Sequence, residues 1–350
     1  MKKRTTVGMD LGDKSHEVCV VGRRGEVVCR EQVMNTKESV LKFFKRYKRA
    51  RVAMETGTHS PWISRELKAL GCDVLVADAR KLEAISGSVR KSDVRDAEML
   101  ARLAQSDQVL LCPIEHRGRE AQEALAIIKA RDLLVGCRTK LINHVRCTVK
   151  SMGERLPSWG GDTFGTKAKE ALPKGLSPAL MPMVEEIEAL TCRIKAYDRQ
   201  IAKVAEKQYP EANRLSQVPG VGPITSLAFV LLLEDASRFK KSRTVGAYVG
   251  LTPRRDQSGQ MDKQLRITKC GDVLMRRLLV GCAQYILGQH GAECDLSRFG
   301  HKLAERGGKN AKRRAVVAVA RKLAVLLHHL WIKSDTYDPD YLKNQQKKAA

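Results

Sequence analysis

The first third of the chain alternates short apolar runs of period two with longer runs of helical spacing. Val7 and Met9 alternate with small residues up to Asp10, which predicts a short buried strand over 5–11. The same signals predict four more strands, over 16–22, 26–33, 50–54 and 72–77. The second and third of these strands are joined at 23–25, so a tight hairpin turn is expected there.

Helical spacing predicts helices over 38–47, over 61–70 and from Ser92 or Asp93 to about 105. Ser60 is placed to cap the second helix, with Pro61 at its first position. Three strands followed by helix, strand, helix, strand and helix is the order of the RNase H-like fold, a mixed sheet with helices on its faces. We therefore predict an α/β domain over residues 1–112.

The following region, 113–210, is predicted to be helical. Residues 116–153 lack strand signals and proline, and apolar side chains recur there at helical spacing among Arg and Lys. Residues 156–182 are rich in Pro and Gly and are predicted to be a loop or a loosely ordered insert. A second long helix is expected over 183–208. Two long helices around a loop suggest either an antiparallel hairpin or a dimerising coiled coil.

A third, mostly helical region is predicted over 211–335, followed by a tail over 336–350. A Gly-Pro turn at 218–223 precedes an apolar helix that ends near 233, and a polar stretch occupies 252–269. Further helices are expected over 272–287 and 309–332, and the last twelve or so residues are expected to fray.

Charge and cysteine usage narrow the class of protein. The chain has 350 residues, 64 of them Lys or Arg against 39 Asp or Glu, and its net charge of +25 predicts a polyanionic partner, most simply nucleic acid. We expect no membrane association, because there is no signal peptide or basic amphipathic anchor, and the longest apolar run, Leu227–Leu233, is far too short to span. Ten scattered cysteines without a C-x-x-C pair are typical of reduced thiols in a cytoplasmic protein.

Four acids have positions that favour a divalent-metal site. Asp10 ends the first strand and Glu55 ends the fourth, and these strands are neighbours in an RNase H-like sheet. Asp93 and Asp96 are three residues apart and share one face of a helix turn. Mg²⁺ prefers such all-oxygen sites, and two metals can activate a nucleophile and stabilise a leaving oxygen at a phosphate. For a single acid, helix capping or solvation is the better explanation of its presence.

Two further segments point to phosphate binding. Gly220 and Gly222 in V-P-G-V-G-P at 218–223 would let backbone N–H groups approach a phosphate, as in a helix-hairpin-helix element; the alternative is an ordinary Gly-Pro turn. Ser258 stands in a basic stretch, and composition alone favours a solvated loop with an incidental serine there. The cations around this serine are Arg254, Arg255, Lys263, Arg266 and Lys269.

Five segments in register resemble the IS110 family of insertion-sequence transposases, the DEDD-type recombinases. They are D-L-G-D-K-S-H at 10–16, M-E-T-G at 54–57, K-S-D-V-R-D-A-E at 91–98, V-P-G-V-G-P, and the block G-L-T-P-R-R…Q-S-G…K…R-I-T-K-C-G-D. The resemblance covers residue 5 to about 330. It departs from the family at Q-S-G-Q-M-D-K, where there is one serine and a loop two residues longer before Lys263.

The resemblance implies a RuvC-like N-terminal domain, a helical coiled-coil middle and a C-terminal transposase domain. It implies that Asp10, Glu55, Asp93 and Asp96 hold Mg²⁺, with Mn²⁺ as a substitute, and that Ser258 forms a covalent phosphoserine link to DNA. Its implied partners are donor and target DNA, a bridge RNA that pairs with both, and further copies of the chain, as dimers that assemble into tetramers. The implied location is the cytoplasm, at the nucleoid.

Two other hypotheses remain open. A metal-only RNase H-like nuclease, such as a junction resolvase, would use water in place of Ser258 and form no protein–DNA adduct. A non-catalytic architectural protein would bind nucleic acid in a salt-sensitive way and be indifferent to loss of Asp10 or Glu55.

Overall fold

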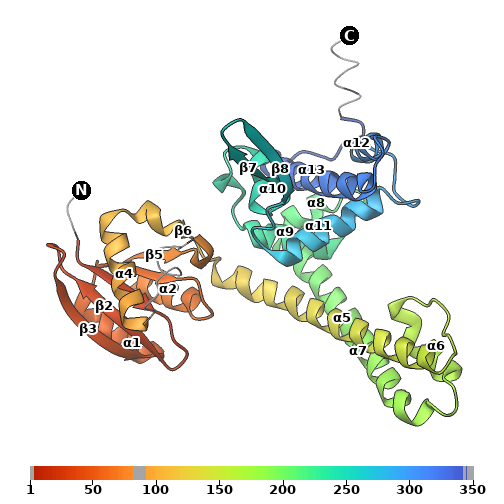
Figure 1. Ribbon diagram of the computed structural model, residues 1–350, viewed down its shortest axis with the longest axis horizontal. Helices are drawn as coiled ribbons and strands as arrows, with labels where there is room; N and C mark the ends of the chain where they lie inside the picture. The colour runs from red at the N-terminus through yellow and green to blue at the C-terminus, as the bar shows by residue number, and fades with distance from the viewer. Residues whose placement is uncertain (1–3, 82–91, 342–343, 345–350) are drawn as a thin grey trace. The chain divides into compact units, whose positions relative to one another are not determined.

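The structure is a computed structural model that describes residues 4–81, 92–341 and 344. The chain forms two compact units, Met1–Gly118 and Arg119–Ala350 (Figure 1). The helical region and the C-terminal region expected from the sequence both fall within the second unit.

The first unit is built on a six-stranded sheet in the order β3-β2-β1-β4-β5-β6. Strands β1, β4 and β5 run parallel, and β2, β3 and β6 are antiparallel to their neighbours. The strands are β1 (Thr6–Asp10), β2 (Ser15–Val21), β3 (Val27–Met34), β4 (Arg51–Glu55), β5 (Asp73–Ala77) and β6 (Pro113–Ile114). The sequence predicted the first five; β6 is too short to leave a pattern.

Helices cover both faces of this sheet. α1 (Lys37–Phe44) and α2 (Ser60–Ala69) contribute Phe43, Phe44 and Leu67 to a core shared with Val7 and Met9 of β1. α4 (Asp93–Ser106) packs on the opposite face, where its Ala97 and Ala101 cluster with residues of β2. Short 3-10 turns complete the unit at Lys45–Tyr47 (η1), Ala79–Lys81 (η2) and Gln108–Leu111 (η3).

The predicted cap of α2 is wrong. His59 is the N-cap residue, without a side-chain cap bond, and Ser60 is the first helical residue. The Ser60 hydroxyl instead donates to the carbonyl of Gly57 at 2.8 Å and accepts from its N–H at 3.0 Å. It also lies 2.8 Å from Nε2 of His116, so it is committed to the turn that precedes the helix.

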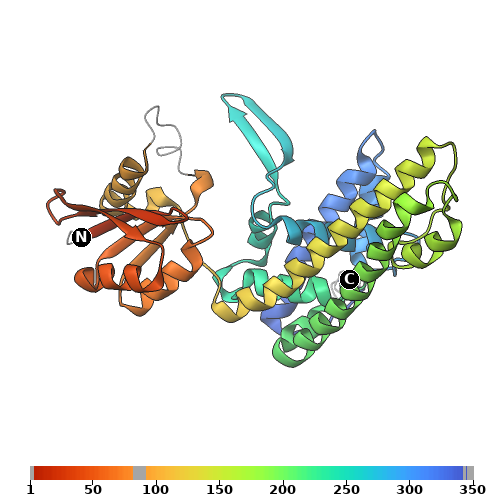
Figure 2. The same cartoon turned by 90° about the horizontal axis from the view of Figure 1, so that it is seen from below.

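The second unit begins with a long antiparallel helical hairpin. α5 (Arg119–Ser151) and α7 (Ser177–Gln208) pack side by side, as Figures 1 and 2 show, which confirms the hairpin expected from the sequence. A salt bridge of 2.8 Å between Arg131 and Asp198 joins them.

The expectation of a loose insert over 156–182 is wrong. This segment holds α6 (Gly161–Ala171), and α7 starts at Ser177 with Pro182 inside it. Phe164 of α6 is fully buried against Val145 and Ile187 of the hairpin helices. Gly165 permits the close approach, since a Cβ there would lie 3.0 Å from the backbone of Glu188. Arg138 secures the helix by donating to Asp162 at 2.6 Å.

The remaining elements form one helical body with a β-hairpin. They are α8 (Pro210–Leu215), α9 (Pro223–Leu233), η4 (Ala236–Arg238), η5 (Ser242–Thr244), α10 (Val245–Tyr248), β7 (Pro253–Ser258), β8 (Met261–Ile267), α11 (Val273–Ile286), α12 (Asp295–Ala304) and α13 (Ala311–Lys333). α9 is buried along nearly its whole length and forms the centre of the core. The hairpin and α12 were not predicted from the sequence.

The helix α13 bears on the expectation that no apolar segment is long enough to span a membrane. Of the helices that the structure describes, it alone is long and apolar enough to cross a membrane. Its Val319, Leu323 and Leu327 are fully buried and belong to the same core as α9 and α11, as in the core helix of a globular domain.

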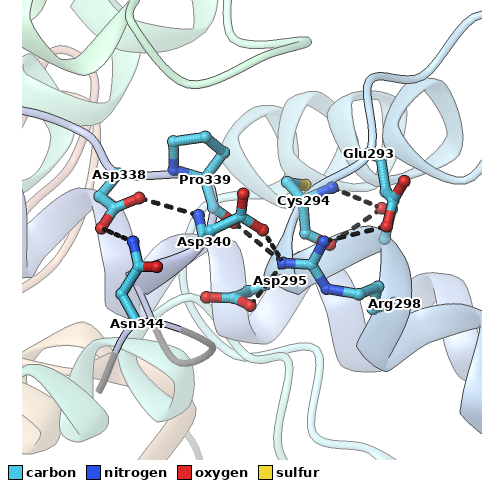
Figure 3. A network of polar contacts seen from close by, with 9 residues as sticks. Glu293, Cys294, Asp295, Arg298, Asp338, Pro339, Asp340 and Asn344 are labelled. Atoms are coloured by element: carbon cyan, nitrogen blue, oxygen red, sulfur yellow. Dashed lines mark hydrogen bonds and ion pairs between the residues drawn. The ribbon is translucent and has the colours of Figure 1, made fainter. Parts of the chain in front are cut away.

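The C-terminal tail, expected to fray over its last twelve or so residues, is anchored at the start of that segment. Arg298 of α12 donates to Asp295 at 2.8 Å, to Asp340 at 2.5 Å and to the carbonyl of Pro339 (Figure 3). The N–H of Asp295 also donates to the Pro339 carbonyl at 2.8 Å. These carboxylates hold the pKa of Arg298 above its ordinary value. The expectation of a frayed end is therefore wrong for Pro339 and Asp340; residues 342–343 and 345–350 lie outside the described residues.

Candidate catalytic acids, serine hairpin and phosphate-binding turn

Asp10 and Glu55 leave the sheet at the same edge. β1 and β4 pair in parallel with Met9 opposite Met54, so the next residue of each strand is one of these acids. Side chains alternate along a strand, and Asp10 therefore points to the same face as Gly8, and Glu55 to the same face as Ala53. That face is covered by α4.

Gly8 determines how closely α4 approaches these acids. A Cβ at Gly8 would lie 1.8 Å from the carbonyl oxygen of Ala97 and 2.6 Å from the nitrogen of Ala101, so α4 rests directly on the β1 backbone. Asp93 and Asp96 stand in the first turn of α4, immediately before this contact. Asp96 is 7% exposed, whereas Asp93 is exposed to solvent. The structure thus places the four predicted acids on the face of the sheet that α4 covers, where β1 and β4 end and α4 begins.

The four acids do not form a ready-made ligand set. Within residues 4–81, 92–341 and 344, no three His, Cys, Asp or Glu side chains lie close enough together to hold a metal ion. The chemistry of the set nevertheless suits a hard divalent cation, because every donor is a carboxylate oxygen. Lys91 of the predicted motif lies outside the described residues.

Glu17 was missed in the sequence, and His16 was recognised there only as a residue that flanks the acids. Glu17 of β2 lies directly opposite Asp10 and accepts a 2.9 Å bond from Nε2 of Gln32. His16 is fully buried, with Nε2 3.1 Å from Oδ1 of Asn35 and Nδ1 without a partner. Burial lowers the pKa of His16. The alternation along β2 places Glu17 on the face covered by α4 and His16 on the opposite face. This alternation is the signal in the sequence that could have identified Glu17.

Ser258 lies at the tip of an exposed hairpin. β7 and β8 pair antiparallel with Ser258 opposite Met261, and Gly259 and Gln260 form the turn between them. Gly259 has φ +55° at the first turn position, the place where a type II′ turn requires glycine. The polar stretch predicted as a loop is thus a two-stranded ribbon, seen in Figure 2, and Ser258 is the last residue of its first strand.

The cations near Ser258 divide between the two faces of this ribbon. Lys263 lies opposite Asp256 and shares Ser258's face, two residue pairs further from the turn. Arg255 lies on the other face, where it pairs with Asp262 at 3.1 Å. Arg254 and Arg266 are exposed on the strands themselves.

The base of the ribbon is fixed by close backbone contacts. Lys269 has φ +57°, and its N–H donates to the carbonyl of Gly250 at 3.1 Å. A Cβ at Gly250 would lie 2.2 Å from the carbonyl oxygen of Cys270, so the two chain segments cross there only because residue 250 is glycine. The tip is exposed while the base is held.

The turn at 218–222 joins α8 to α9, an arrangement that both a helix-hairpin-helix element and an ordinary Gly-Pro turn predict. Gly220 has φ +84°, and a Cβ there would lie 2.8 Å from the Tyr285 ring of α11, so packing as well as conformation selects glycine. Gly222 is exposed at the N-cap of α9, without a side-chain cap bond and with no atom within 4 Å of an added Cβ. Pro223 has no N–H, so the first N–H groups of α9 are those of Ile224 and Thr225, which follow the exposed Gly222.

Comparisons with known proteins agree with these motifs. Residues 7–153 match a DEDD transposase family of IS110 elements, and residues 212–296 match the family described as "Transposase IS116/IS110/IS902 family". The chain is 29% identical to a probable family 20 transposase of Pseudomonas aeruginosa, over 95% of this chain and 98% of that protein. It is 28% identical to the transposase for insertion sequence element IS1111A of Coxiella burnetii, over 96% and 92%. It is 26% identical to the transposase for insertion sequence element IS1328 of Yersinia enterocolitica, over 81% and 84%.

The matched segments contain both the sheet edge with its acids and the hairpin with Ser258. The relatives align over nearly the full length of the chain. The chain is a DNA transposase, and the family models that it matches are those of the IS110/IS116 insertion-sequence transposases.

Proposed function

We propose that this transposase cuts and rejoins DNA through a covalent phosphoserine intermediate at Ser258. The observation that carries the proposal is the placement of Ser258 at the exposed end of a ribbon whose base is held and whose own face carries Lys263. A nucleophile that must reach a phosphate inside a DNA duplex needs such a projecting position, and an incidental serine does not.

The step conserves the phosphodiester bond. Ser258 Oγ attacks the phosphorus, a bond from Oγ to phosphorus forms, and the bond to one ester oxygen of the DNA strand breaks to release a hydroxyl end. The Oγ proton leaves to solvent or to a nearby carboxylate. In the second step a hydroxyl end of another strand attacks the same phosphorus and releases Ser258. No nucleotide cofactor is needed, because each bond broken is replaced by one of the same kind.

Asp10, Glu55, Asp93 and Asp96 are the proposed ligands of Mg²⁺, with Mn²⁺ as a substitute. Bound there, the metal would lower the pKa of the attacking hydroxyl and stabilise the charge on the leaving oxygen. The placement of these acids at one end of the α4 layer supports this assignment. Because the described carboxylates are not yet gathered into a ligand set, binding of metal and DNA would draw them together.

Basic and glycine-rich segments are proposed to hold the DNA backbone. Gly222 and Gly220 would present α9 N–H groups to one phosphate. Exposed cations of the ribbon would contact further phosphates, namely Arg254, Arg255, Lys263, Arg266 and Lys269. A bridge RNA pairing with donor and target DNA, and a dimer that assembles into a tetramer in the cytoplasm, complete the proposal; the net charge of +25 supports the RNA partner.

A covalent-adduct assay tests the proposal. The protein is incubated with the DNA ends of its element, the flanking non-coding RNA and Mg²⁺, then denatured and examined for DNA attached to protein. Wild type is expected to give an adduct, and Ser258→Ala and Asp10→Asn are expected to reduce it at least about a hundredfold. Cleavage that persists in Ser258→Ala without any adduct would favour the metal-only nuclease. Binding without cleavage in wild type would favour an architectural protein.

A further inference from the structure

A basic hollow lies at the opposite end of the first unit's sheet from the catalytic acids. Its volume is about 540 Å³. It sits where β1, β4 and β5 begin, next to the turn between β2 and β3. The residues that line it are Arg4, Thr5, Arg23, Arg46, Tyr47, Lys48, Arg49, Ala50, Gly71 and Asp73.

The charge around this hollow is strongly unbalanced. Five of its lining residues are Arg or Lys, and Asp73 is the only acid among them. Asp73 is already engaged, because it accepts from Arg51 at 2.9 Å and lies 3.7 Å from Arg4. Arg23, Lys48 and Arg49 form no salt bridge within the part of the chain that the structure describes. Three exposed cations thus face one concavity without a counter-charge.

Two neighbouring side chains give the hollow a fixed wall. Arg46 donates to both carboxylate oxygens of Glu31, at 2.8 and 3.0 Å, and its guanidinium lies 4.6 Å from the centre of the Phe43 ring. Tyr47 stands beside it, 5.2 Å from Phe43 between ring centres. This packing holds the segment 46–49 against the body of the unit, so the free cations of that segment do not depend on a loose loop.

The backbone at Arg49 adds a second observation. Arg49 has φ +65°, a left-handed conformation that costs a residue other than glycine about 1 kcal/mol. Glycine would adopt this conformation without that cost, yet the position holds a long, exposed cation that lines the hollow. A strained residue of this kind points to a role for its side chain.

We propose that this hollow is a second DNA-backbone site, which binds phosphates of the duplex away from the catalytic acids. Like charges gathered around a concavity repel one another, and phosphate oxygens are the partners that relieve this repulsion while Arg and Lys donate hydrogen bonds. The protein acts on DNA, so a duplex is the phosphate-bearing molecule that it must hold. Nothing in this inference depends on Ser258.

The two ends of the sheet are far enough apart to contact different phosphates. Five residues separate Thr5 from Asp10 along β1, and a strand rises about 3.3 Å per residue, so the hollow lies about 17 Å from the acids. Phosphates follow one another at about 3.4 Å of duplex axis per strand. The hollow would therefore engage the backbone about five nucleotides from the one at the acids, and would anchor DNA without taking part in its cleavage.

Binding of random-sequence duplex DNA tests the proposal without any chemistry. Lys48→Gln with Arg49→Gln is compared with Lys42→Gln with Lys68→Gln, which removes the same charge from exposed positions of α1 and α2 outside the hollow. The first pair is expected to weaken DNA binding about tenfold at physiological salt and to make the slope of log K against log salt less negative by about 2. The control pair is expected to change affinity less than about twofold.

The variant Arg49→Gly distinguishes a loss of DNA affinity from a loss of folding stability. Glycine relieves the left-handed strain but loosens the unfolded chain, so the free energy of unfolding should change by less than about 1 kcal/mol while DNA affinity falls. Equal losses in the two charge-matched pairs, or no loss at Lys48 and Arg49, would overturn the proposal. So would a loss confined to single-stranded RNA of the same sequence. Weaker DNA binding by the Lys48 and Arg49 variant supports the proposal whether or not its RNA binding also falls. This conclusion holds even if Ser258→Ala still cleaves DNA.

Discussion

At the scale of single residues, Gly8 determines how closely the acid-bearing helix α4 approaches β1. Gly8 has no side chain, so α4 rests on β1 and carries Asp96 toward the edge where Asp10 ends the strand. The positions of the acids could be predicted from the sequence, since each follows a strand or opens a helix. Gly8 could not, because one glycine inside an apolar run gives no sign of which helix will cross it.

Replacing Gly8 by Ala should force α4 off the sheet. The new Cβ would meet the Ala97 carbonyl at 1.8 Å, so we expect the first unit to lose about 3 kcal/mol of its free energy of unfolding. Urea unfolding followed through Trp62 measures this, in a chain whose Trp159 and Trp331 are changed to Phe. Gly57→Ala is the control, because no atom lies within 4 Å of its Cβ position, and it should change the value by less than about 0.5 kcal/mol. Equal stability of the two variants would contradict the packing of α4 on Gly8.

The buried His16 and the half-buried His116 should make the first unit sensitive to mild acid. Burial lowers the pKa of His16, and burial together with Arg65, Lys68 and Arg117 lowers that of His116. The folded unit therefore binds fewer protons than the unfolded chain, in which histidine titrates near pH 6.5. The two neutral histidines therefore contribute their full stability to the folded unit above about pH 6.5, and this contribution is lost as the pH falls below that value.

Urea midpoints of the Trp62-reporting chain at pH 7.5 and 5.5 check this, and the midpoint should be lower at pH 5.5. In His116→Gln the difference between the two pH values should shrink, because one of the two groups no longer titrates. A midpoint that rises on acidification would show that neither histidine is held neutral by the fold.

At the scale of elements, the ribbon of β7 and β8 receives little support from the rest of the second unit. Both of its faces are exposed, and a two-stranded ribbon alone is marginal in water. The sequence did not predict it, since its strands are polar on both sides and give no period-two signal. The helices within 156–182 were not predicted because the Pro and Gly residues of this segment are helix-breaking in general. Gly165 allows α6 to pack closely on α7, and Pro182 lies in the second turn of α7.

The turn residue Gly259 should control the reactivity of Ser258. Gly259→Ala places a Cβ at φ +55° and costs the ribbon about 1 kcal/mol, which corresponds to about a fivefold smaller population of the ordered tip. The yield of protein–DNA adduct should fall by that factor, while the thermal unfolding temperature of the chain stays the same. Gln260→Ala, which needs no left-handed backbone, should leave the yield unchanged. An unchanged adduct yield in Gly259→Ala would show that the geometry of the ribbon's turn does not control the reaction of Ser258.

At the scale of the whole molecule, the proposed chemistry is divided between two compact units. The acids and the basic hollow belong to Met1–Gly118, and Ser258 and the helix-hairpin-helix turn belong to Arg119–Ala350. Periodicity and motif order predicted the sheet, the long hairpin and the helical body. They could not predict how the acids approach one another, because carboxylates gather only when a cation offsets their repulsion.

The most direct test of the account is to identify the residue that carries DNA. The adduct formed with the element's DNA ends, its RNA and Mg²⁺ is digested with nuclease and protease, and the nucleotide-bearing peptide is sequenced by mass spectrometry. We predict a nucleotide linked through phosphate to Ser258, and no such peptide from Asp10→Asn. A nucleotide on another side chain, or cleaved DNA without any linked peptide, would contradict the account.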